Sequence, residues 1–371
     1  MIKKNILVLF GTRPEAIKLA PVIKELKKNK THFNTTVCVT GQHREMLDQI
    51  LSFFEITPEI DLNLMTHNQS LTELTSKILL EVDQVIKQGN YDYIIVQGDT
   101  TTVYASAVAA FYNNVKVIHV EAGLRSFDFE HPFPEEFNRR SIAPFTHMHF
   151  APSEGAKNNL INENIRIDKI WNVGNTVIDA LQYALPIANK ENFSNLFPQV
   201  DFNKDIILVT GHRRENFGGP LEAICGAFKQ IVQNDDVQIV YPVHLNPNVK
   251  ETVHQLLDDE KNIHLIAPLP YPQLIWLMSQ SKLVITDSGG IQEEAPAMGK
   301  PVLVTREVTE RKEVVESGNA IMVGNDTDKI IKLSSELLNN SELYNKMSSA
   351  SNPYGDGNAA VKMIEILKSH E

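Results

Sequence analysis

Short apolar runs alternate along the chain with longer segments whose apolar residues recur at helical spacing. In the first half, runs rich in β-branched residues predict strands at Ile6–Phe10, Thr36–Val39, Tyr93–Val96, Val115–Val120 and His147–Phe150. Helical patterns lie between them at Pro14–Lys28, Leu71–Lys87 and the alanine-rich Thr101–Tyr112. This alternation predicts an α/β domain with a doubly wound parallel sheet.

A second series of strands follows the polar, irregular stretch Asn189–Lys204. Its strands are expected at Ile206–Thr210, Val237–Tyr241, Ile263–Ile266, Leu283–Thr286 and Val302–Val304. We therefore predict two Rossmann-like domains, at residues 1–188 and 189–352. In the remaining segment, 353–371, a helix at Gly357–Lys368 is expected to cross back to the first domain.

Glycine and polar residues follow most of the predicted strands. Glycines stand at positions Gly11, Gly41, Gly98, Gly123, Gly211 and Gly289. Open parallel sheets bind their ligands at the carboxyl ends of the strands. We therefore expect two such edges that face each other across a cleft.

Composition limits the classes of protein to which the chain can belong. A chain of 371 residues that is 42% hydrophobic can bury a large core. The net charge of −11 argues against a nucleic-acid partner. Cys38 and Cys225 lie in apolar runs, which is typical of buried thiols in a reducing cytoplasm. No apolar segment reaches the roughly 20 residues that span a bilayer, so we expect no membrane partner.

The stretch 283–299 has the form of an anion-binding turn. A predicted strand runs into Asp287-Ser288-Gly289-Gly290 and then into a helical pattern. Glycines let backbone N–H groups approach a diphosphate, and Glu294, one turn later, can accept hydrogen bonds from a ribose. An ordinary β–α turn with glycines for tight packing would look the same, and this motif alone leaves the two interpretations equal.

Another turn with cations follows the first strand. Gly11 is followed by Arg13 and Lys18 at the start of a predicted helix. The pattern is neither the Gly-x-Gly-x-x-Gly dinucleotide fingerprint nor a phosphate loop ending in Gly-Lys-Ser/Thr, so we predict no bound NAD and no cofactor. Arg13 and Lys18 are either sugar or phosphate contacts or solvated charges at a helix end.

Three carboxylates, Asp99, Glu121 and Glu135, lie at or beyond the ends of later strands. Taken singly, Asp99 could cap a helix, Glu121 could pair with Arg125, and Glu135 could be a first-turn charge. In one cleft, like charges would drive their pKa values apart, as acid and base catalysis requires.

The second domain opens with a cationic turn. His212 and Arg213 follow the strand Ile206–Thr210, and His244 and Arg311 occupy similar places. A structural histidine is the usual role of an isolated residue, but His-Arg-Arg at a strand end suits a leaving diphosphate. The twelve histidines show no His-Glu-x-x-His spacing, so we predict no metal.

In order, the motifs of this chain closely resemble those of the bacterial non-hydrolysing UDP-N-acetylglucosamine 2-epimerases. The resemblance runs from about residue 5 to about residue 365 and is carried by segments 11–18, 40–44, 97–100, 119–125, 134–139, 211–216, 242–247 and 287–296. It implies a glycosyltransferase-B-like fold, a homodimer, and cytoplasmic interconversion of UDP-GlcNAc and UDP-ManNAc for surface polysaccharide synthesis.

The resemblance also implies roles for individual residues. Asp99, Glu121 and Glu135 would supply the acid, the base and oxocarbenium stabilisation, and Arg13 and His212 would steady the diphosphate. The remaining substrate contacts are expected from Lys18, Arg139, Arg213, Ser288, Gly289, Gly290, Glu294 and Arg311. Some members of the family bind a second, activating UDP-GlcNAc, and the corresponding positions are Gln42, Gln69, Glu136, Arg213 and His244.

Three rival functions share these features. A hydrolysing epimerase would release free ManNAc and UDP from the same intermediate. A glycosyltransferase of the same fold would need an acceptor site, which the sequence does not show. A nucleotide-sugar sensor would bind UDP-GlcNAc without chemistry, and the three carboxylates argue against it.

Overall fold

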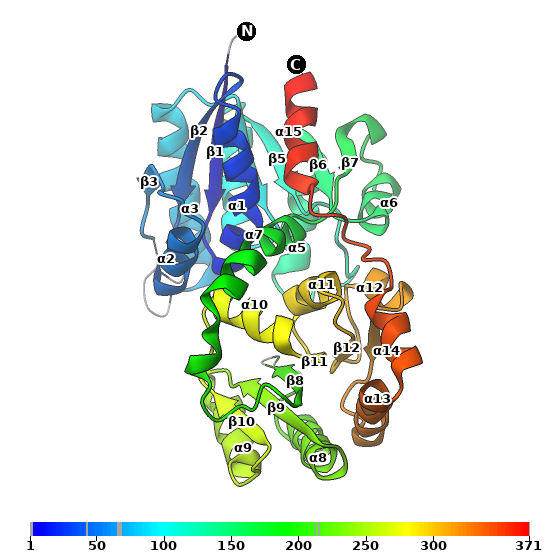
Figure 1. Cartoon of the computed structure of the whole chain (residues 1–371). Helices are drawn as coiled ribbons and strands as arrows, with labels where there is room; N and C mark the ends of the chain where they lie inside the picture. The colour runs from blue at the N-terminus through cyan, green and yellow to red at the C-terminus, as the bar shows by residue number, and fades with distance from the viewer. Residues whose placement is uncertain (1–2, 42–43, 65–68, 212, 214–215, 371) are drawn as a thin grey trace. The chain divides into compact units, whose positions relative to one another are not determined.

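The computed structural model describes residues 3–41, 44–64, 69–211, 213 and 216–370. The chain divides into two compact units, one formed by Met1–Ala180 with Tyr354–Glu371 and the other by Leu181–Pro353 (Figure 1). The sequence placed the first boundary at residue 188. Helix α7 (Thr176–Glu191) runs through this region without a break, so the first unit ends within a helix.

The first unit is built on a seven-stranded sheet within the described residues, and every paired strand is parallel to its neighbour. Across the sheet the order is β3 (Ile60–Asp61), β2 (Phe33–Val39), β1 (Lys4–Phe10), β4 (Tyr93–Gln97), β5 (Lys116–Val120), β6 (Met148–Ala151) and β7 (Ile170–Asn172). Both faces of such a sheet are covered, which explains the unbroken apolar runs in the sequence.

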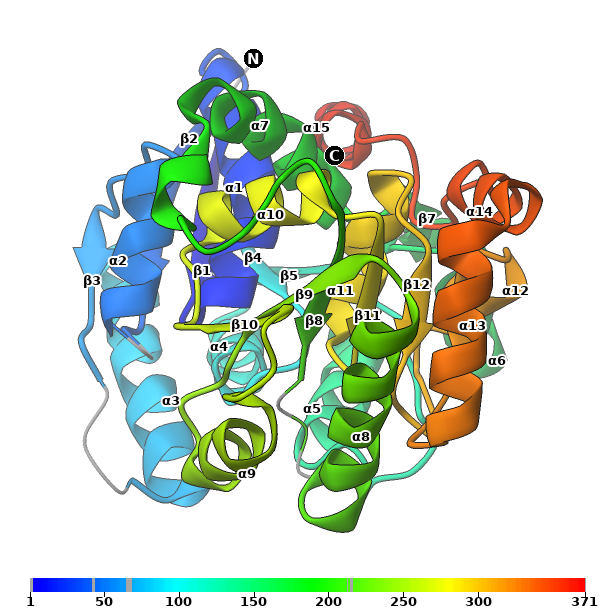
Figure 2. The same ribbon diagram turned by 60° about the horizontal axis from the view of Figure 1, so that its bottom comes forward.

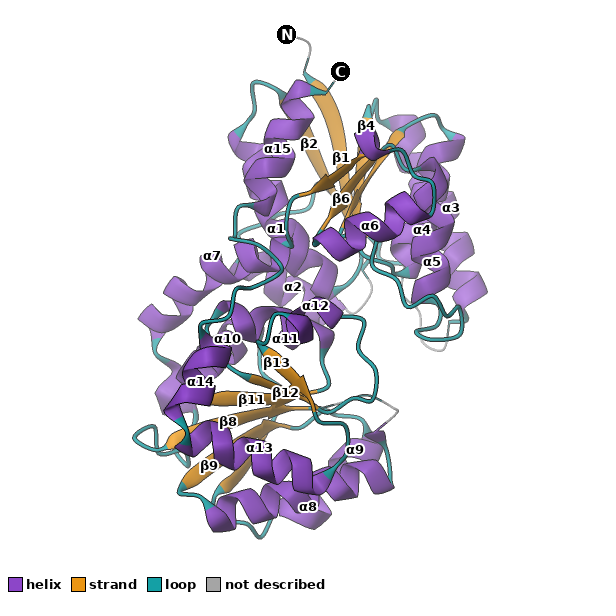
Figure 3. Ribbon diagram, turned by 90° about the vertical axis from the view of Figure 1, so that its right-hand side faces the viewer, coloured by secondary structure: helices purple, strands orange, loops and turns teal. Residues whose placement is uncertain are grey.

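Helices connect these strands. Their bounds are α1 (Arg13–Lys28), α2 (Arg44–Phe53), α3 (Leu71–Gln88), α4 (Thr101–Tyr112), α5 (Glu135–Ile142), η1 (Ala143–Phe145), α6 (Glu154–Asn162), η2 (Ile167–Lys169) and α15 (Ala359–Ser369). Helices α3 and α4 pack with Leu7 and Leu9 of β1 in one buried cluster. Helix α4 also contacts α5, and the three helices lie side by side (Figure 3).

The second unit is built on a six-stranded parallel sheet within the described residues. Its order is β10 (Ile263–Ile266), β9 (Val237–Pro242), β8 (Asp205–Thr210), β11 (Leu283–Thr286), β12 (Val302–Val304) and β13 (Ala320–Met322). Its helices are η3 (Phe193–Leu196), α8 (Gly219–Asn234), α9 (Pro247–Leu257), α10 (Tyr271–Gln280), α11 (Gly289–Ala297), α12 (Lys312–Glu316), α13 (Thr327–Asn339) and α14 (Ser341–Ser348). Helices α8, α9 and α13 bury Phe228, Val253 and Ile330 in its main core, and α8 lies beside α13 (Figure 2).

Two parallel α/β units confirm the predicted fold class, and each of the ten predicted strands is present. The sequence missed β3, β7 and β13, which are only two or three residues long. Runs this short have too few positions to show a period, and β12 (Val302–Val304), which is equally short, is predicted because all three of its residues are apolar and β-branched or leucine. No helix in the described part of the chain is long and apolar enough to cross a membrane.

The C-terminal helix α15 belongs to the first unit, as predicted, where it packs against α1. Asp179 of α7 anchors the first turn of α15. The Asp179 carboxylate accepts hydrogen bonds from the backbone N–H groups of Ala359 (3.2 Å) and Ala360 (2.8 Å). The preceding chain lies against Gly174, where φ is +94° and a Cβ would come within 3.0 Å of the Tyr354 carbonyl oxygen. Burial raises the pKa of Asp179, and the two N–H donors oppose this shift.

Replacing Asp179 with alanine should loosen the start of α15. The change removes two charge-assisted hydrogen bonds to a helix N-terminus and leaves two buried N–H groups without an acceptor, at a cost of about 1–3 kcal/mol. Hydrogen–deuterium exchange should show faster exchange of the Ala359 and Ala360 amides. The exposed Asp168, which pairs with Arg166 at 2.6 Å, provides the control. Asp168→Asn should leave those amides unchanged, and equal exchange in wild type and Asp179→Ala would contradict the anchoring role.

Candidate functional site

The polar residues predicted for the first unit gather at the carboxyl ends of three adjacent strands. Arg13 follows β1, Asp99 follows β4 and Glu121 follows β5, and these strands are neighbours in the sheet. The register pairs Gln97 with Val120, so the turns that carry Asp99 and Glu121 leave the sheet side by side.

Glu121 is held by three side chains that donate hydrogen bonds or positive charge. Lys18 of α1 lies 2.5 Å from its Oε1, Asn175 donates to the same oxygen at 3.3 Å, and Gln97 donates to Oε2. The carboxylate side chain is 7% exposed. The backbone of Glu121 has φ +63°, which is uncommon for a residue with a Cβ and is typical of functional turns.

Arg125, the alternative partner of Glu121, forms its ion pair with Glu163 instead. The Arg125 guanidinium, whose side chain is fully buried, forms a two-pronged pair with Glu163 at 2.9 and 2.7 Å. Burial would raise the pKa of Glu163, but the hydrogen bond and charge of Arg125 lower it overall. The cation that neutralises Glu121 is therefore Lys18, which lies 103 positions away in the sequence.

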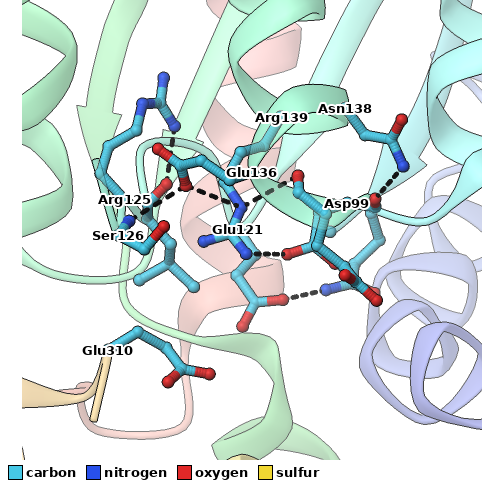
Figure 4. Close-up of polar contacts among 12 residues, drawn as sticks. Asp99, Glu121, Arg125, Ser126, Glu136, Asn138, Arg139 and Glu310 are labelled. Carbon is cyan, nitrogen blue, oxygen red and sulfur yellow. Dashed lines mark hydrogen bonds and ion pairs between the residues drawn. The ribbon is translucent and has the colours of Figure 1, made fainter. Parts of the chain in front are cut away.

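Asp99 is fixed from α5. Its carboxylate lies 2.8 Å from Nη2 of Arg139, and its carbonyl oxygen accepts from the Asn138 amide at 2.8 Å (Figure 4). The residue that caps α4 is Thr100, whose hydroxyl accepts from the Val103 N–H, so the helix-cap alternative for Asp99 is not what the structure shows.

Arg139 also connects Asp99 to Glu136. The Arg139 side chain is 4% exposed, and its Nε lies 3.6 Å from the Glu136 carboxylate (Figure 4). Glu136 is fully buried and accepts from the backbone N–H groups of Ser126 (3.0 Å) and Phe127 (3.1 Å). Here Glu136 shapes the loop after β5, and a direct contact with an activating nucleotide would require it to leave these partners.

Glu135 is the first residue of α5 and is half-buried. Its position matches the alternative of a first-turn helix charge. Its backbone carbonyl accepts a hydrogen bond from Nε of Arg139 at 3.3 Å, so the arginine that holds Asp99 also holds the start of this helix. Among the three predicted carboxylates, Glu135 thus shares a partner with Asp99.

Glu15 is a site residue that the sequence did not single out. Its Oε2 accepts from the N–H groups of Gly11 (3.0 Å) and Thr12 (2.7 Å), and its Oε1 accepts from the Thr100 hydroxyl at 2.7 Å. Burial raises its pKa, and these hydrogen bonds oppose the shift. The side chain therefore ties the turn after β1 to the turn after β4. Thr12 and Glu15 have the spacing of a capping box, which could have revealed half of this arrangement.

The other predicted residues of the first unit have simpler surroundings. Arg13 is half-buried at the first position of α1. The ammonium group of Lys18 lies against the carboxylate of Glu121. Gln69 is half-buried and precedes Ser70, the N-cap of α3. Gln42 and His212 lie outside the described residues.

The anion-binding turn predicted in the second unit is present. Ser288 is the N-cap of α11, and its side chain makes no capping hydrogen bond among the described residues. Gly289 lies under the guanidinium of Arg311, where a Cβ would come within 2.8 Å of Cζ. Gly290 has open space where a side chain would stand. The helix start therefore places the backbone N–H groups of Gly289 and Gly290 beside a fixed cation, an arrangement that suits an anion.

Acidic side chains hold Arg311 in place. Its Nη2 lies 3.0 Å from Glu293 and its Nη1 lies 2.6 Å from Glu310. Glu310 also pairs with Arg306 at 2.8 Å and lies 3.9 Å from Nη2 of Arg213. Burial favours a raised pKa for Glu310, but the charges of Arg311 and Arg306 prevail and hold it at about 2.

Arg213 also participates through its backbone. Its N–H donates to Asp287 at 2.9 Å, and the amide of Asn216 donates to the same oxygen at 3.1 Å. Asp287 is 1% exposed, so it joins the turn after β8 to the turn after β11 inside the protein. The sequence did not assign a role to this aspartate.

Glu294 and His244 are in different surroundings. The buried hydroxyl of Tyr271 donates to Oε1 of Glu294 at 2.9 Å, and Glu294 itself is 5% exposed. This bond fixes one carboxylate oxygen, as a residue that binds a ribose hydroxyl requires. His244 is exposed, and its Nδ1 accepts from the N–H of Asn246 at 3.1 Å.

Each unit thus carries its own cluster of polar and charged groups at the carboxyl ends of its strands. The first provides anchored carboxylates beside buried cations, and the second provides a helix N-terminus beside arginines. In the part of the chain that the structure describes, no group of three or more His, Cys, Asp or Glu side chains could hold a metal ion.

Comparisons with known proteins agree over nearly the whole chain. Residues 24–368 match the family model for UDP-N-acetylglucosamine 2-epimerase. The UDP-N-acetylglucosamine 2-epimerase of Campylobacter jejuni is 50% identical over 98% of this chain and 97% of its own. The crystal structure of UDP-GlcNAc 2-epimerase from Neisseria meningitidis bound to UDP-GlcNAc is 46% identical, with a TM-score of 0.93 over 99% of this chain and 100% of that one.

A more distant archaeal structure shares the same fold. The Methanocaldococcus jannaschii UDP-GlcNAc 2-epimerase, solved in complex with UDP-GlcNAc and UDP, is 34% identical, with a TM-score of 0.84 over 99% of this chain and 100% of its own. The family model and the close relatives both extend through the two units described above. This chain therefore belongs to the UDP-N-acetylglucosamine 2-epimerase family.

Proposed function

We propose that this protein is a non-hydrolysing epimerase that interconverts UDP-GlcNAc and UDP-ManNAc by inverting C2 of the sugar, and that its product supplies surface polysaccharide synthesis. The observation that carries the proposal is the pair of anchored carboxylates, Asp99 and Glu121, on adjacent turns of the first unit, each beside its own buried cation. Family membership supplies the substrate class, and these carboxylates supply groups that can move a proton.

The chemistry requires the bond from C1 to the diphosphate to break. The C2 hydrogen has no neighbouring carbonyl, so its removal becomes feasible only as the C1–O bond to UDP breaks and C1 gains oxocarbenium character. A base takes the C2 proton, UDP leaves with the bonding electrons, and 2-acetamidoglucal forms. An acid then protonates C2 on the opposite face and UDP adds back to C1, so the reaction needs no redox cofactor.

The carboxylates of the first unit are suited to this proton exchange. Lys18 places an ammonium group against Glu121, and Arg139 places a guanidinium group against Asp99. Asp99, Glu121 and Glu135 together supply acid, base and stabilisation of the positive charge at C1. Arg13 and His212 steady the diphosphate as it gains charge.

The second unit is suited to the UDP moiety. In the proposed complex the diphosphate meets the hydroxyl of Ser288 and the N–H groups of Gly289 and Gly290, together with the guanidinium groups of Arg213 and Arg311. The carboxylate of Glu294 accepts from the ribose, and the hydroxyl of Tyr271 donates to its Oε1. The carboxylates of the first unit have no equivalent function in a sensor that only binds the nucleotide sugar.

The decisive measurement is proton NMR of UDP-GlcNAc incubated with the protein in D2O, without added NAD or metal. We expect UDP-ManNAc to appear with deuterium at C2, because the abstracted proton exchanges with solvent before C2 is reprotonated. Free ManNAc with UDP would establish the hydrolysing alternative. An unchanged spectrum would reject the epimerase proposal and favour a transferase or a sensor.

Replacing either anchored carboxylate should stop proton exchange at C2. Glu121→Gln and Asp99→Asn should each lower kcat for deuterium incorporation by about 100-fold or more, because general acid–base catalysis typically contributes this much. Isothermal titration with UDP should show that nucleotide binding is retained. Glu154→Gln changes a carboxylate of the same unit that is 60% exposed and should have no such effect. Activity of Glu121→Gln close to that of wild type would remove Glu121 from the mechanism.

We further propose that two copies of the chain form a dimer through helices α4 and α5. Phe111 and Tyr112 at the end of α4 are 52% and 71% exposed, and Phe137 of α5 is 46% exposed. Tyr104 of α4 packs against Phe137 of α5, and Phe111 packs against Phe145, so exposed aromatic side chains are present on both helices. An exposed apolar patch of this kind is typical of a protein interface.

Sedimentation equilibrium tests this interface. The wild-type protein should have about twice the mass of one chain, and Phe111→Glu should shift it to a monomer, because a buried unpaired charge at an apolar interface is costly. Ile167→Glu introduces the same charge at another exposed apolar residue, which is 66% exposed in η2, and should leave the dimer intact. A wild-type monomer at micromolar concentrations would contradict the proposal.

A further inference from the structure

His119 is a buried residue to which the proposed mechanism assigns no task. It lies on β5, two positions before Glu121, and is 1% exposed. Its Nε2 lies 2.7 Å from the carbonyl oxygen of Gly98, in the turn that carries Asp99. A carbonyl oxygen can only accept, so Nε2 carries the hydrogen and donates it.

This bond completes a clamp on the turn after β4. The N–H of Gly98 donates to the Val120 carbonyl at 3.0 Å, and the carbonyl of Gly98 accepts from His119. Both polar groups of Gly98 are thus tied to β5. Gly98 has φ +79°, a conformation outside the strand range, so the peptide that follows it needs an external partner to keep a single orientation.

The residues on both sides of Gly98 belong to the proposed site. Gln97 donates to Glu121, and Asp99 pairs with Arg139. A rotation of the peptide between positions 98 and 99 would therefore move the Asp99 carboxylate relative to Glu121. Displacements of about 1 Å in a catalytic group can cost about 100-fold in rate.

The charge state of His119 allows it to donate its hydrogen bond to Gly98 at all pH values near neutrality. Burial lowers its pKa to about 4; the charges of Arg125 and Arg139 act in the same direction, whereas the Gly98 carbonyl and Glu121 oppose the shift. The ring is therefore neutral near pH 7. It keeps one N–H for Gly98 and does not titrate in the range where an enzyme of this kind works.

We infer that His119 is a positioning residue for the epimerisation, because its bond to Gly98 fixes the turn that aims Asp99 at the reacting sugar. The inference rests on the proposed function. This positioning role differs from a general packing role because it requires a hydrogen-bond donor at Nε2 of the His119 ring.

A neighbouring histidine provides the comparison. His149 stands opposite His119 on β6, is fully buried, and has its pKa lowered to about 3, mainly by burial. Among the hydrogen bonds of the described residues, none joins His149 to the turn at positions 97–99. Substitutions at His149 therefore disturb the same region of the core but remove no hydrogen bond of the clamp.

The experiment compares glutamine with asparagine at both positions. The Nε2 of glutamine reaches about as far along the side chain as the Nε2 of histidine, whereas asparagine is one methylene shorter. We expect His119→Asn to lower kcat by about tenfold to about 100-fold with KM changed by less than about threefold. His119→Gln should recover most of kcat. His149→Gln and His149→Asn should have equal kcat values.

Two further readouts separate positioning from packing. Thermal unfolding should show similar midpoints for His119→Gln and His119→Asn, although their kcat values differ. The pH profile of kcat/KM for His119→Gln should match that of wild type from about pH 6 to about pH 9, because His119 neither gains nor loses a proton during turnover.

The possible outcomes distinguish this inference from the proposed function. Wild-type protein that leaves UDP-GlcNAc unchanged would reject the function itself. Active wild type with equal kcat values for His119→Gln and His119→Asn would reject only the positioning role. Losses of kcat that follow the unfolding midpoints at both histidines would assign His119 to packing and overturn the inference.

Discussion

The proposed active centre depends on charge balance at the carboxyl edge of the first sheet. Glu15, Glu121 and Glu136 lie there with little exposure to solvent, and Asp99, whose side chain is 29% exposed, lies at the same edge. Unpaired charges at the buried positions would be costly. Lys18 and Arg139 supply the compensating positive charge. Backbone N–H groups satisfy Glu15 and Glu136, so these two side chains shape the turns, whereas the two ion-paired carboxylates point to chemistry.

This balance constrains the backbone as well as the side chains. Glu121 adopts a left-handed conformation that few residues with a Cβ tolerate, and Gly98 beside it has a positive φ as well. A Cβ at Gly98 would lie 3.8 Å from Oε2 of Glu121. Thus the turn after β4 approaches the carboxylate closely, and the hydrogen bonds of Gln97 and His119 keep it there. Strained turns of this kind persist only where several surrounding contacts hold the backbone in the same conformation.

The sequence predicted the two sheets because long apolar runs between helical patterns report local structure directly. It also identified the strand-end residues Asp99 and Glu121, since position after a strand is a local property too. It could not identify the pairing of Lys18 with Glu121, because that contact depends on how α1 crosses the sheet. The pairing of Arg125 with Glu163 was missed for the same reason: Glu121 is nearer in sequence, but the helix that follows β6 brings Glu163 to the guanidinium. Likewise, the role of Asp179 at the start of α15 depends on two segments about half the chain apart.

In the second unit the arrangement of charges is the reverse of that in the first, because arginines surround a carboxylate. Arg213, Arg306 and Arg311 surround Glu310, whose pKa of about 2 keeps it ionised under all ordinary conditions. The arginines beside the N-terminus of α11 are therefore fixed in place before any ligand arrives. A diphosphate that binds at Gly289 and Gly290 adds negative charge where Glu310 already stands, so the two anions compete for the same guanidinium groups. Such a site binds UDP more weakly than an uncompensated cluster of arginines would. In the proposed reaction this is an advantage, because the diphosphate must leave the sugar and return to it within each turnover, and a site that held free UDP too tightly would favour the separated intermediate over the product.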